Sequence, residues 1–321
     1  MMADAYPELI GMTEVAHPAG VNILVSTYNG GPFLNQQMDS LLAQTYPSFK
    51  ITVRDDGSDD GTYERLLEYA GEHQNVFVIR GRNLGVSGCF FELLSKADDQ
   101  CDFYAFSDQD DVWLPHKIQD AVDAMMRHDL SYPLMYFSRL ELVDSELRHI
   151  SYTPIVRRPH FANALVESNA YGCTIVLNKA ARAAILDQHP NGKPDHDWWS
   201  YLVVSHLGSV IYDEKPNIKH RLHTRNTAGC YISWKDQVLD RLIAFRSRNC
   251  RSSRYSVQAT EFYRCYGDRL EPYRRKSLED FIGCKEERIG RRIKYAYRTN
   301  VFLQNKWATL WFRVKIVLGN Y

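Results

Sequence analysis

The most informative residues for the fold are 103–113, which read FYAFSDQDDVW. Residues 103–106 are apolar and aromatic, as in a short buried strand. Three carboxylates then follow within four positions, at Asp108, Asp110 and Asp111. Carboxylates this close repel one another, and a divalent cation is the natural counter-charge because hard cations prefer oxygen ligands. Since open α/β sheets bind ligands at the carboxyl ends of their strands, the stretch predicts a metal-assisted site. The alternative is an acidic loop that caps the next helix.

Upstream of this loop, β-rich runs alternate with helical patterns. The expected strands are residues 21–26, 49–54, 76–80 and 103–106, and the expected helices are residues 33–44, 62–72 and 87–97. This order predicts an α/β fold with a mostly parallel sheet flanked by helices. The loops after the strands are polar and contain glycine, so together they would form a crevice for a nucleotide. Gly81, Gly85 and Gly88 lack the Gly-x-Gly-x-x-Gly spacing of a dinucleotide-binding loop.

The second half of the chain alternates less regularly. We expect helices over residues 115–128, 180–188 and 194–202, strands over residues 134–139, 173–177 and 210–212, and an irregular stretch over residues 144–168. From residue 233 onward the chain is arginine-rich, helix-prone and poor in Gly and Pro. The sequence therefore predicts a loose leader over residues 1–20, a catalytic domain over residues 21–232 and a basic helical extension over residues 233–321.

Charge is unevenly distributed along a chain whose formal net charge is zero. Residues 235–321 carry 20 Lys/Arg and 9 Asp/Glu, a net charge of +11, so the preceding residues carry −11. The two parts are therefore expected to face different partners. Near the end of the chain, Trp307, Trp311 and Phe312 lie among Lys and Arg, which suits a membrane interface. The alternative is a helix packed on the catalytic domain with a solvated basic face.

The seven cysteines are scattered and form no Cys-x-x-Cys pair, which favours free thiols in a reducing compartment. No segment contains 18 consecutive apolar residues, and the first twenty residues lack the basic and apolar regions of a signal peptide. We therefore expect a cytoplasmic protein, with contact to the inner face of the cell membrane as an added hypothesis.

Four motifs occur in one order: residues 26–29 (STYN), 55–58 (DDGS), 83–85 (NLG) and 108–111 (DQDD). Together with the first strand they resemble the inverting glycosyltransferase family 2, which has the GT-A fold. The run 107–113, followed by Gly172-Cys173 and by residues 196–199 (HDWW), is most similar to the bacterial rhamnosyltransferase-like branch. The resemblance covers about residues 21–230.

The resemblance implies a nucleotide-sugar site contributed by several loops. Its residues would be Ser26, Tyr28, Asn29, Asp55, Asp56, Asn83, Gly85, Asp108 and Arg221. Tyr28 offers a ring to the base, and Asp56 would accept a hydrogen bond from the imide nitrogen of uracil or thymine, because a carboxylate is an acceptor. Asp55 is an equal candidate for this contact. The structural alternative for both is a turn that caps the helix after Thr62.

The resemblance also implies a metal site and a general base. Asp110, together with Asp108, would hold Mg²⁺ or Mn²⁺ on the diphosphate, with His223 as a candidate third ligand. Asp111 would support this loop or cap the next helix. Arg221, His223 and Asn226 would suit diphosphate contacts. Asp197 is the expected general base of an inverting displacement. Trp198 and His196 would contact the acceptor, with His196 and Asp195 as alternative bases and Trp199 a core residue.

The implied function is metal-dependent transfer of a sugar to a glycan or lipid-linked glycan in surface polysaccharide synthesis. The first candidate donor is dTDP-rhamnose, and UDP-galactose and UDP-glucose are the alternatives. A nucleotidyltransferase would favour a basic, glycine-rich loop after the first strand, but residues 27–32 contain no basic residue. A nucleic-acid or membrane adaptor built on the basic extension would leave the acidic loops unexplained. We therefore expect no nucleic-acid partner.

Overall fold

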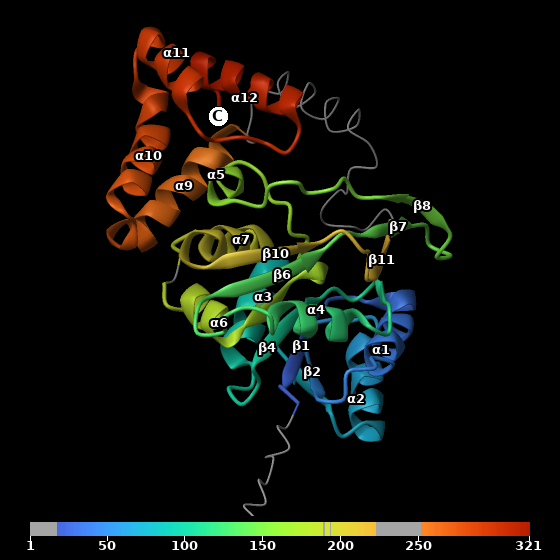
Figure 1. Ribbon diagram of the computed structural model, residues 1–321. Coiled ribbons are helices and arrows are strands. Elements are labelled where there is room, and N and C mark those ends of the chain that lie inside the picture. Colours follow the sequence, from blue (N-terminus) through green and yellow to red (C-terminus); the bar gives the residue numbers. More distant parts are fainter. Residues whose placement is uncertain (1–17, 189, 193, 223–251) are drawn as a thin grey trace, which may run out of the picture.

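A computed structural model describes residues 18–188, 190–192, 194–222 and 252–321 (Figure 1). Its centre is a seven-stranded sheet in the order β10-β6-β9-β4-β1-β2-β3. The strands are β1 (Val21–Thr27), β2 (Phe49–Asp55), β3 (Val76–Arg80), β4 (Phe103–Ser107), β6 (Leu134–Ser138), β9 (Val176–Asn178) and β10 (Ser209–Asp213). Strand β9 runs antiparallel to β4 and β6, and the other pairs are parallel. The predicted α/β fold with a mostly parallel sheet is confirmed.

Helices cover both faces of this sheet. They are α1 (Leu34–Leu42), α2 (Thr62–Glu72), α3 (Gly85–Lys96), α4 (Lys117–Met125), α6 (Lys179–Leu186) and α7 (His196–Leu207). Because side chains alternate between the faces of a strand, Phe103 and Ala105 of β4 join the core with α1, α2 and α4. Tyr104 and Phe106 join the core with α3, α6 and α7. The alternation of a strand buried on both sides thus builds two cores.

A second, smaller sheet connects the acidic loop to a distant part of the chain. It has the order β5-β11-β7-β8, with β5 (Val112–Trp113), β7 (Glu141–Val143), β8 (His149–Tyr152) and β11 (Ile218–Arg221). Strand β11 pairs antiparallel with β5, directly after the acidic loop, and parallel with β7. The end of β11 therefore lies beside residues 108–111.

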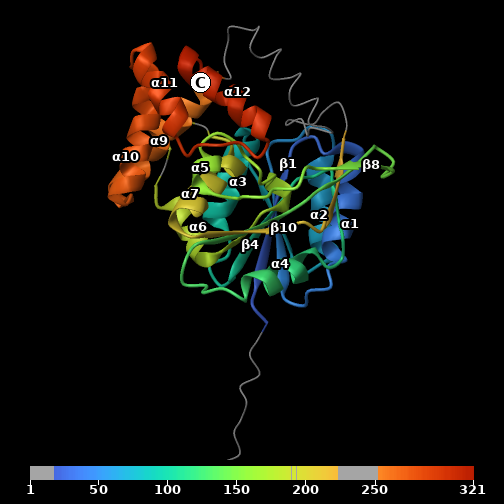
Figure 2. The same ribbon diagram turned by 45° about the horizontal axis from the view of Figure 1, so that its top comes forward.

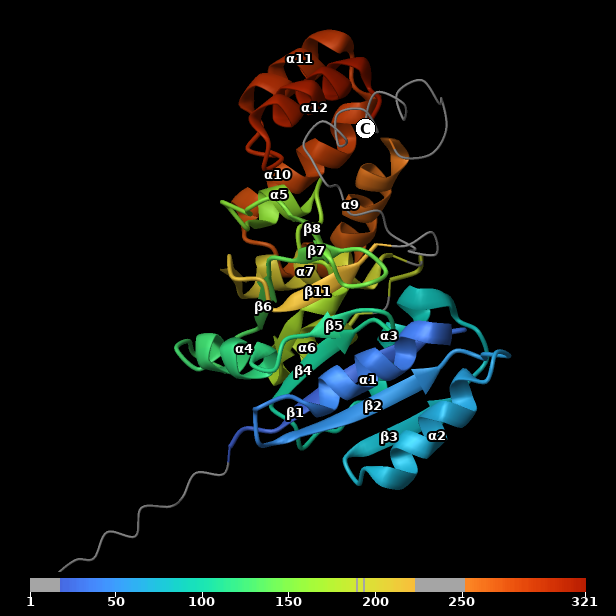
Figure 3. The same ribbon diagram turned by 90° about the vertical axis from the view of Figure 1, so that its right-hand side faces the viewer.

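The C-terminal helices are α9 (Ser252–Tyr266), α10 (Pro272–Gly283), α11 (Ile289–Arg298) and α12 (Lys306–Leu318). Figures 1 and 3 show α11 and α12 at the end of the molecule away from α2, and Figure 2 shows the four helices grouped together. Phe262, Phe281 and Phe312 from these helices belong to the same core as Trp199 of α7. The basic extension therefore packs on the catalytic part of the chain.

Short elements complete the described chain. They are α5 (Phe161–Ala164) and the 3₁₀ turns η1 (Gly31–Phe33), η2 (Gly172–Thr174), η3 (Gly267–Arg269) and η4 (Cys284–Glu286). The expected strand over residues 173–177 begins only at residue 176. Hydrogen bonds from Ile175 N to Gly172 O (3.0 Å) and from Thr174 Oγ1 to Tyr171 O (2.7 Å) close a tight turn first. The stretch 144–168, expected to be irregular, contains β8 and α5.

Other expectations concern segments and thiols. The leader falls almost entirely, and the boundary near residue 232 wholly, outside the described residues, so these domain limits stay predictions. In the described part of the chain, no helix is long and apolar enough to cross a membrane. The cysteines described there, Cys89, Cys101, Cys173, Cys265 and Cys284, are free and buried.

Candidate active site

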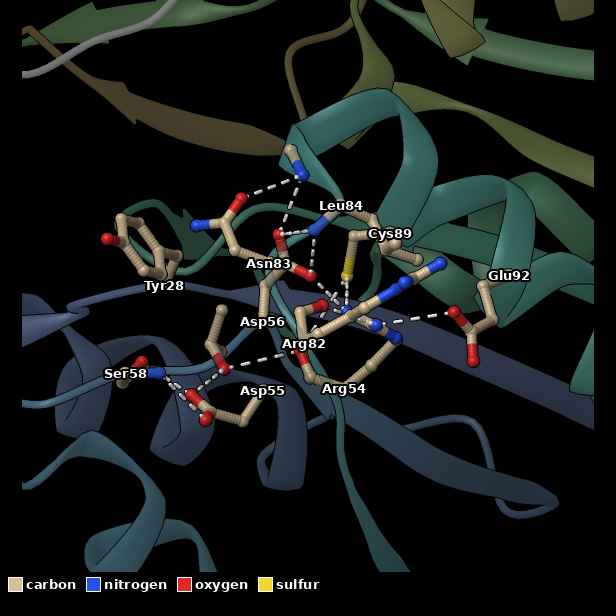
Figure 4. Close-up of polar contacts among 12 residues, drawn as sticks. Tyr28, Arg54, Asp55, Asp56, Ser58, Arg82, Asn83, Leu84, Cys89 and Glu92 are labelled. Atoms are coloured by element: carbon tan, nitrogen blue, oxygen red, sulfur yellow. Dashed lines mark hydrogen bonds and ion pairs between the residues drawn. The ribbon is translucent and has the colours of Figure 1, made fainter.

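Asp55, the last residue of β2, is held by donors from its own loop (Figure 4). Its carboxylate accepts hydrogen bonds from Ser58 N (3.0 Å), from Ser58 Oγ and from Thr27 Oγ1 (3.4 Å). Its side chain is fully buried. Asp55 therefore fastens the turn after β2 to the end of β1. The N-cap residue of α2 is Gly61, and the carboxylate of Asp60 accepts a hydrogen bond from Thr62 N at 3.1 Å.

Asp56 links β2 to the turn before α3. Its carboxylate accepts from Leu84 N (2.8 and 2.9 Å to the two oxygens) and from Gly85 N (2.9 Å), and it forms an ion pair with Arg54. Gly85 has φ +75°, a left-handed conformation that favours glycine. A carboxylate has about four acceptor positions, and Arg54, Gly85 N and Leu84 N, which contacts both oxygens, fill them in a residue that is 2% exposed. The contact with an imide N–H stays a prediction.

Arg54 is the buried partner that the sequence did not reveal. Its side chain is 2% exposed, lies 3.2 Å from Glu92 and donates to Arg82 O at 3.0 Å. Burial alone would lower the pKa of Arg54, but the hydrogen bonds that it donates to Asp56 and Cys89, together with the charge of Glu92, raise this pKa. Figure 4 shows Arg54, Cys89 and Glu92 to the right of Asp56, and Tyr28 to its left. Arg54 thus neutralises the acids that shape this part of the crevice.

The loop after β1 is fastened to the acidic loop through Gln109. The Gln109 side chain accepts from Tyr28 N (2.9 Å) and donates to Tyr28 O (3.0 Å). The Tyr28 ring is about half exposed and is therefore open to a ligand. Asn29 donates through its backbone to Ser58 Oγ and accepts from Asp59 N, and Ser26 lies half-buried at the end of β1. The predicted nucleotide residues of these loops are thus neighbours.

The acidic loop after β4 has a different environment. Burial, then the charges of Asp111 and Asp110, and also that of Asp197, raise the pKa of Asp108 well above its usual range. Asp111 is fully buried, and its Oδ1 lies 2.8 Å from His220 Nδ1 and 3.2 Å from Arg221 N. Burial alone would raise the pKa of Asp111, but His220 and these donors lower it. Asp197, from α7, is therefore near enough to Asp108 for its charge to act on this carboxylate.

Arg221 holds the acidic loop through backbone and side-chain contacts. Its guanidinium donates to Asp110 O (2.9 Å), Ser145 O (2.6 Å) and Gln36 Oε1 (2.6 Å). The side chain is buried and lies over the Phe33 ring at 4.6 Å. The predicted contact between Arg221 and a diphosphate stays a prediction. In the structure, Arg221 anchors the backbone of Asp110.

Asp197 lies in the first turn of α7 and is half-buried. Burial is the main cause that raises its pKa to about 6, while backbone donors at Trp198, Asp197 and Gly172 act in the opposite direction. Trp198 N is 2.6 Å from Asp197 Oδ1. Gly172 leaves little space here, because a Cβ on it would lie 2.8 Å from His196 Nε2 and 3.8 Å from Asp197 Cβ. A pKa of about 6 suits a general base at neutral pH, and the role of Asp197 as this base stays a prediction.

The two predicted acceptor residues flank Asp197. His196 is buried, its ring stacks on Phe90 at 4.1 Å, and burial lowers its pKa to about 3. It is therefore neutral at pH 7, and its Nε2 has no hydrogen-bond partner among the described residues. Trp198 is 8% exposed and donates to Ala164 O at 2.6 Å. Trp199 is fully buried in the core.

The described residues offer two settings for a divalent cation. Asp108 and Asp110 fit one, because a cation would offset the burial of Asp108 and its repulsion by Asp111 and Asp110, which together raise its pKa. Asp111, Cys173 and His220 also bring ligand atoms within 4.8 Å of one another. There, however, Asp111 already contacts His220 directly, and the buried Lys117 carries a competing positive charge close by. The donor set at Asp108 and Asp110 is the better fit.

Some expected and unexpected residues remain. His223 and Asn226 lie outside the described residues, so their roles stay predictions. Lys117 is fully buried, with its Nζ 3.5 Å from the centre of the Trp113 ring, and burial lowers its pKa to about 7. No pattern in the sequence distinguishes Lys117 from a solvated lysine at the start of a helix. Gln109 was visible only as the residue between two acids.

The fold and the site together define the class of the protein. A mostly parallel α/β sheet with acidic loops at its strand ends is the arrangement of the GT-A glycosyltransferases. The structure superposes on the crystal structure of S. aureus TarS 1-349 in complex with UDP-GlcNAc with a TM-score of 0.55, at 17% identity over 93% of this chain and 81% of that one. The chain belongs to glycosyltransferase family 2, whose model, described as "Glycosyl transferase family 2", matches residues 22–188, more than half of the chain.

Two curated relatives show the range within the family. The chain is 26% identical to "dTDP-rhamnosyl transferase RfbG" of Shigella flexneri over 66% of this chain and 75% of that protein. It is 25% identical to "UDP-Glc:alpha-D-GlcNAc-diphosphoundecaprenol beta-1,3-glucosyltransferase WfgD" of Escherichia coli, over 59% of this chain and 72% of that protein. The relatives therefore name different donors.

Proposed function

We propose that the protein is an inverting, metal-dependent glycosyltransferase that moves a sugar from a nucleoside-diphosphate donor to a glycan or lipid-linked glycan. The observation that carries this proposal is that Asp197 of α7 lies close enough to Asp108 of the acidic loop for its charge to raise the pKa of Asp108. A carboxylate suited to remove a proton thus lies beside carboxylates suited to hold a cation on a diphosphate.

Asp197 is the proposed general base. With a pKa of about 6, it is mostly ionised at pH 7 and is still close enough to that pH to accept a proton efficiently. It takes the proton of the acceptor hydroxyl while that oxygen bonds to the anomeric carbon. The bond from this carbon to the diphosphate oxygen breaks on the opposite face, and the configuration inverts. His196, neutral and fixed by Phe90, orients the N-terminus of α7.

Asp108 and Asp110 would hold the cation, Mg²⁺ or Mn²⁺. When bound, the ion would supply charge neutralisation for the departing diphosphate. Arg221 keeps the Asp110 backbone in place through its 2.9 Å hydrogen bond. Gln109 connects this loop to Tyr28, the predicted contact of the nucleobase. The cation site and the nucleobase site are therefore joined by one side chain.

The proposed donor is dTDP-rhamnose, supported by the motifs around Asp108 and Asp197 and by the name of the RfbG relative. The second candidate is a UDP-hexose, such as UDP-glucose or UDP-galactose, supported by the name of the WfgD relative. Both are compatible with the contact predicted for Asp56 or Asp55, because uracil and thymine carry the same imide N–H. The acceptor that the WfgD name contains is a lipid-linked sugar, so we further propose that this enzyme works at the inner face of the cell membrane.

A ligand panel tests the proposal. Each of dTDP-rhamnose, UDP-glucose, UDP-galactose and a GDP-sugar is added with Mn²⁺ or with EDTA, and thermal unfolding is measured, because a ligand of the native state raises Tm. We expect a rise with dTDP-rhamnose that requires the cation and is lost in Asp110→Ala. Asp59→Asn, an exposed acid of the other loop, is the matched control and should respond like the wild type.

The panel also separates the outcomes. A rise with UDP-sugars alone would keep the class and replace rhamnose as the donor. A rise of equal size in EDTA would remove the metal from the proposal. The absence of a rise with every nucleotide would contradict the donor site itself. The anomeric configuration of the transferred sugar, measured by NMR, then tests inversion.

A further inference from the structure

Helix α12 is apolar on two opposite sides. Ala308, Phe312 and Ile316 are buried against the rest of the molecule. A second stripe faces solvent: Trp307, which is 75% exposed, together with Leu310, Val314 and Leu318. Positions three and four apart lie on one side of a helix, so the exposed side chains form a continuous strip. A helix that is apolar all round is normally covered, and here half of it is not.

Helix α11 repeats this pattern. Ile289, Ile293 and Tyr297 follow one another at intervals of four and are all exposed, Tyr297 by 84%. Isolated exposed apolar residues are ordinary, but a contiguous group of them marks a contact surface. We call the seven exposed side chains of α11 and α12 the apolar face.

The charge on the two helices of the apolar face is positive, although Glu287, just before α11, pairs with Arg291. Residues 289–318 contain seven Lys/Arg and no Asp/Glu. Lys294, Arg298 and Lys306 are exposed. Trp and Tyr beside Lys and Arg are the composition of helices that lie in the headgroup region of a bilayer. A partner with an anionic rim and an apolar interior would match both features.

We propose that the apolar face of α11 and α12 docks on an anionic phospholipid surface. A second copy of this chain fits less well, because it would bring two such basic surfaces together. Nucleic acid would use the positive charge and leave Trp307, Leu310 and Leu318 in water. The proposal rests on the proposed function in one respect: a lipid-linked acceptor would be presented at that surface.

An aromatic series connects the docking helix to the site. Phe312, on the buried side of α12, lies 5.7 Å from the Tyr255 ring of α9. Tyr255 in turn lies 5.9 Å from the ring of Trp198, the neighbour of Asp197. In Figure 1, α9 and α5 lie between α12 and the sheet. Docking of α12 would therefore hold the phospholipid surface at a fixed position relative to Asp197, with one layer of packed helices between them.

The apolar face differs from the interfacial group that the sequence predicts. That group contains Trp307, Trp311 and Phe312, but Phe312 is 3% exposed and belongs to the core. The structure replaces Phe312 with Leu310, Val314 and Leu318. Docking on lipid would thus leave the packing of α12 on the protein intact.

The test is cosedimentation of the full chain with vesicles. Vesicles of phosphatidylcholine with one third phosphatidylglycerol are compared with pure phosphatidylcholine, at low and at high salt. We expect binding to the anionic vesicles that weakens with salt, and a fall of about tenfold or more in Trp307→Ser/Leu310→Ser/Leu318→Ser. Met126→Ser/Tyr132→Ser removes two similarly exposed apolar side chains outside the face and should bind as the wild type does.

Further readouts make the result decisive. Lys294→Glu/Lys306→Glu should reduce binding to anionic vesicles only. Thermal unfolding of each variant confirms that the fold is kept, since these side chains are exposed. Equal binding of the triple variant and the wild type, or no binding by the wild type, would overturn the proposal. So would a concentration-dependent dimer that the triple variant abolishes, since it would assign the face to a second copy. Transfer to a soluble acceptor reports on the proposed function separately, because it needs no vesicle.

Discussion

Two groups of aspartates follow parallel strands of the same sheet, yet their surroundings differ. Around Asp55 and Asp56, the protein supplies donors: Ser58, the backbone of Leu84 and Gly85, and the Arg54 guanidinium. Around Asp108, it supplies more carboxylates, and the pKa of Asp108 rises. The first group is electrostatically balanced by the protein and shapes a pocket. The second stores repulsion that a cation would relieve. Aspartates at equivalent strand ends therefore have two roles, one in shaping a pocket and one in a site suited to a cation.

The largest effect should come from Asp197, which raises the pKa of Asp108 from the side of α7. Asp197→Asn keeps the shape but cannot accept a proton, so we expect transfer to fall by roughly 10³–10⁴ with donor binding retained. Asp59→Asn, an exposed acid of the loop after β2, is the control and should stay near wild type. Product formation and the donor-induced rise in Tm measure the two effects. Loss of donor binding in Asp197→Asn would contradict the assignment.

The pH dependence of kcat/KM is a second test of Asp197 as the general base. Burial raises the pKa of Asp197 to about 6, so the active, ionised form is lost as the pH falls through about 6 rather than through about 4. We expect kcat/KM to fall tenfold per pH unit below this value and to be level above it. A profile that stays level down to pH 5 would mean that another group accepts the proton.

Substitution of Asp108 is expected to change the transfer activity and the stability of the fold in opposite directions. Because its pKa is raised in the folded state, its ionised form destabilises the fold at neutral pH. Asp108→Asn should therefore raise the free energy of unfolding in EDTA at pH 7 while it lowers transfer by roughly 10²–10³. Denaturant unfolding and the transfer assay measure the two changes. A loss of stability on this substitution would mean that Asp108 is balanced by the protein, as Asp56 is.

Much of this contrast lies beyond what the sequence predicts. Strands β1 to β4 and helices α1 to α3 are predictable because apolar runs of strand length alternate with helical spacing and turn residues. The acids after β2 and β4 are visible for the same reason. Their surroundings are not, since Arg54 meets Glu92 and Asp111 meets His220 through pairings between distant residues. Arg54 reads only as the polar end of a strand.

The C-terminal helices illustrate the same limit. The sequence groups Trp307, Trp311 and Phe312 in one interfacial set, whereas the structure exposes Trp307 and buries Phe312. Which side of α12 is covered depends on the position of Tyr255 in α9, a distant contact that spacing does not encode. Similarly, Lys117 lies at the start of α4, a place where lysine is usually solvated, and the small sheet buries it. Local patterns predict elements, and long-range contacts decide exposure and charge balance.

The buried ion pair between Arg54 and Asp56 is tested by removing the charge of Asp56. Asp56→Asn leaves Arg54, which is 2% exposed, with Glu92 as its remaining acid, so we expect a loss of about 3 kcal/mol of unfolding free energy. Asp59→Asn in the same loop is exposed and should change stability by less than about 0.5 kcal/mol. Arg54→Met/Asp56→Asn should recover part of the loss because no buried charge then lacks its partner. A double variant less stable than Asp56→Asn would contradict this account.

The smallest effect concerns Arg221, which serves the unbalanced loop through its backbone. Arg221→Lys keeps the charge but cannot reach Asp110 O, Ser145 O and Gln36 Oε1 together. We expect the Mn²⁺ concentration for half-maximal transfer to rise about tenfold, as for other residues that hold metal ligands in place. Arg139→Lys, which loses a 2.7 Å hydrogen bond to Thr153 O in the smaller sheet, controls for lost packing and should leave the Mn²⁺ requirement unchanged. A rise in the donor KM at constant Mn²⁺ requirement would instead place Arg221 on the diphosphate, as the sequence motif predicts. The measurement therefore decides whether this arginine acts on the substrate or on the loop that holds the acids.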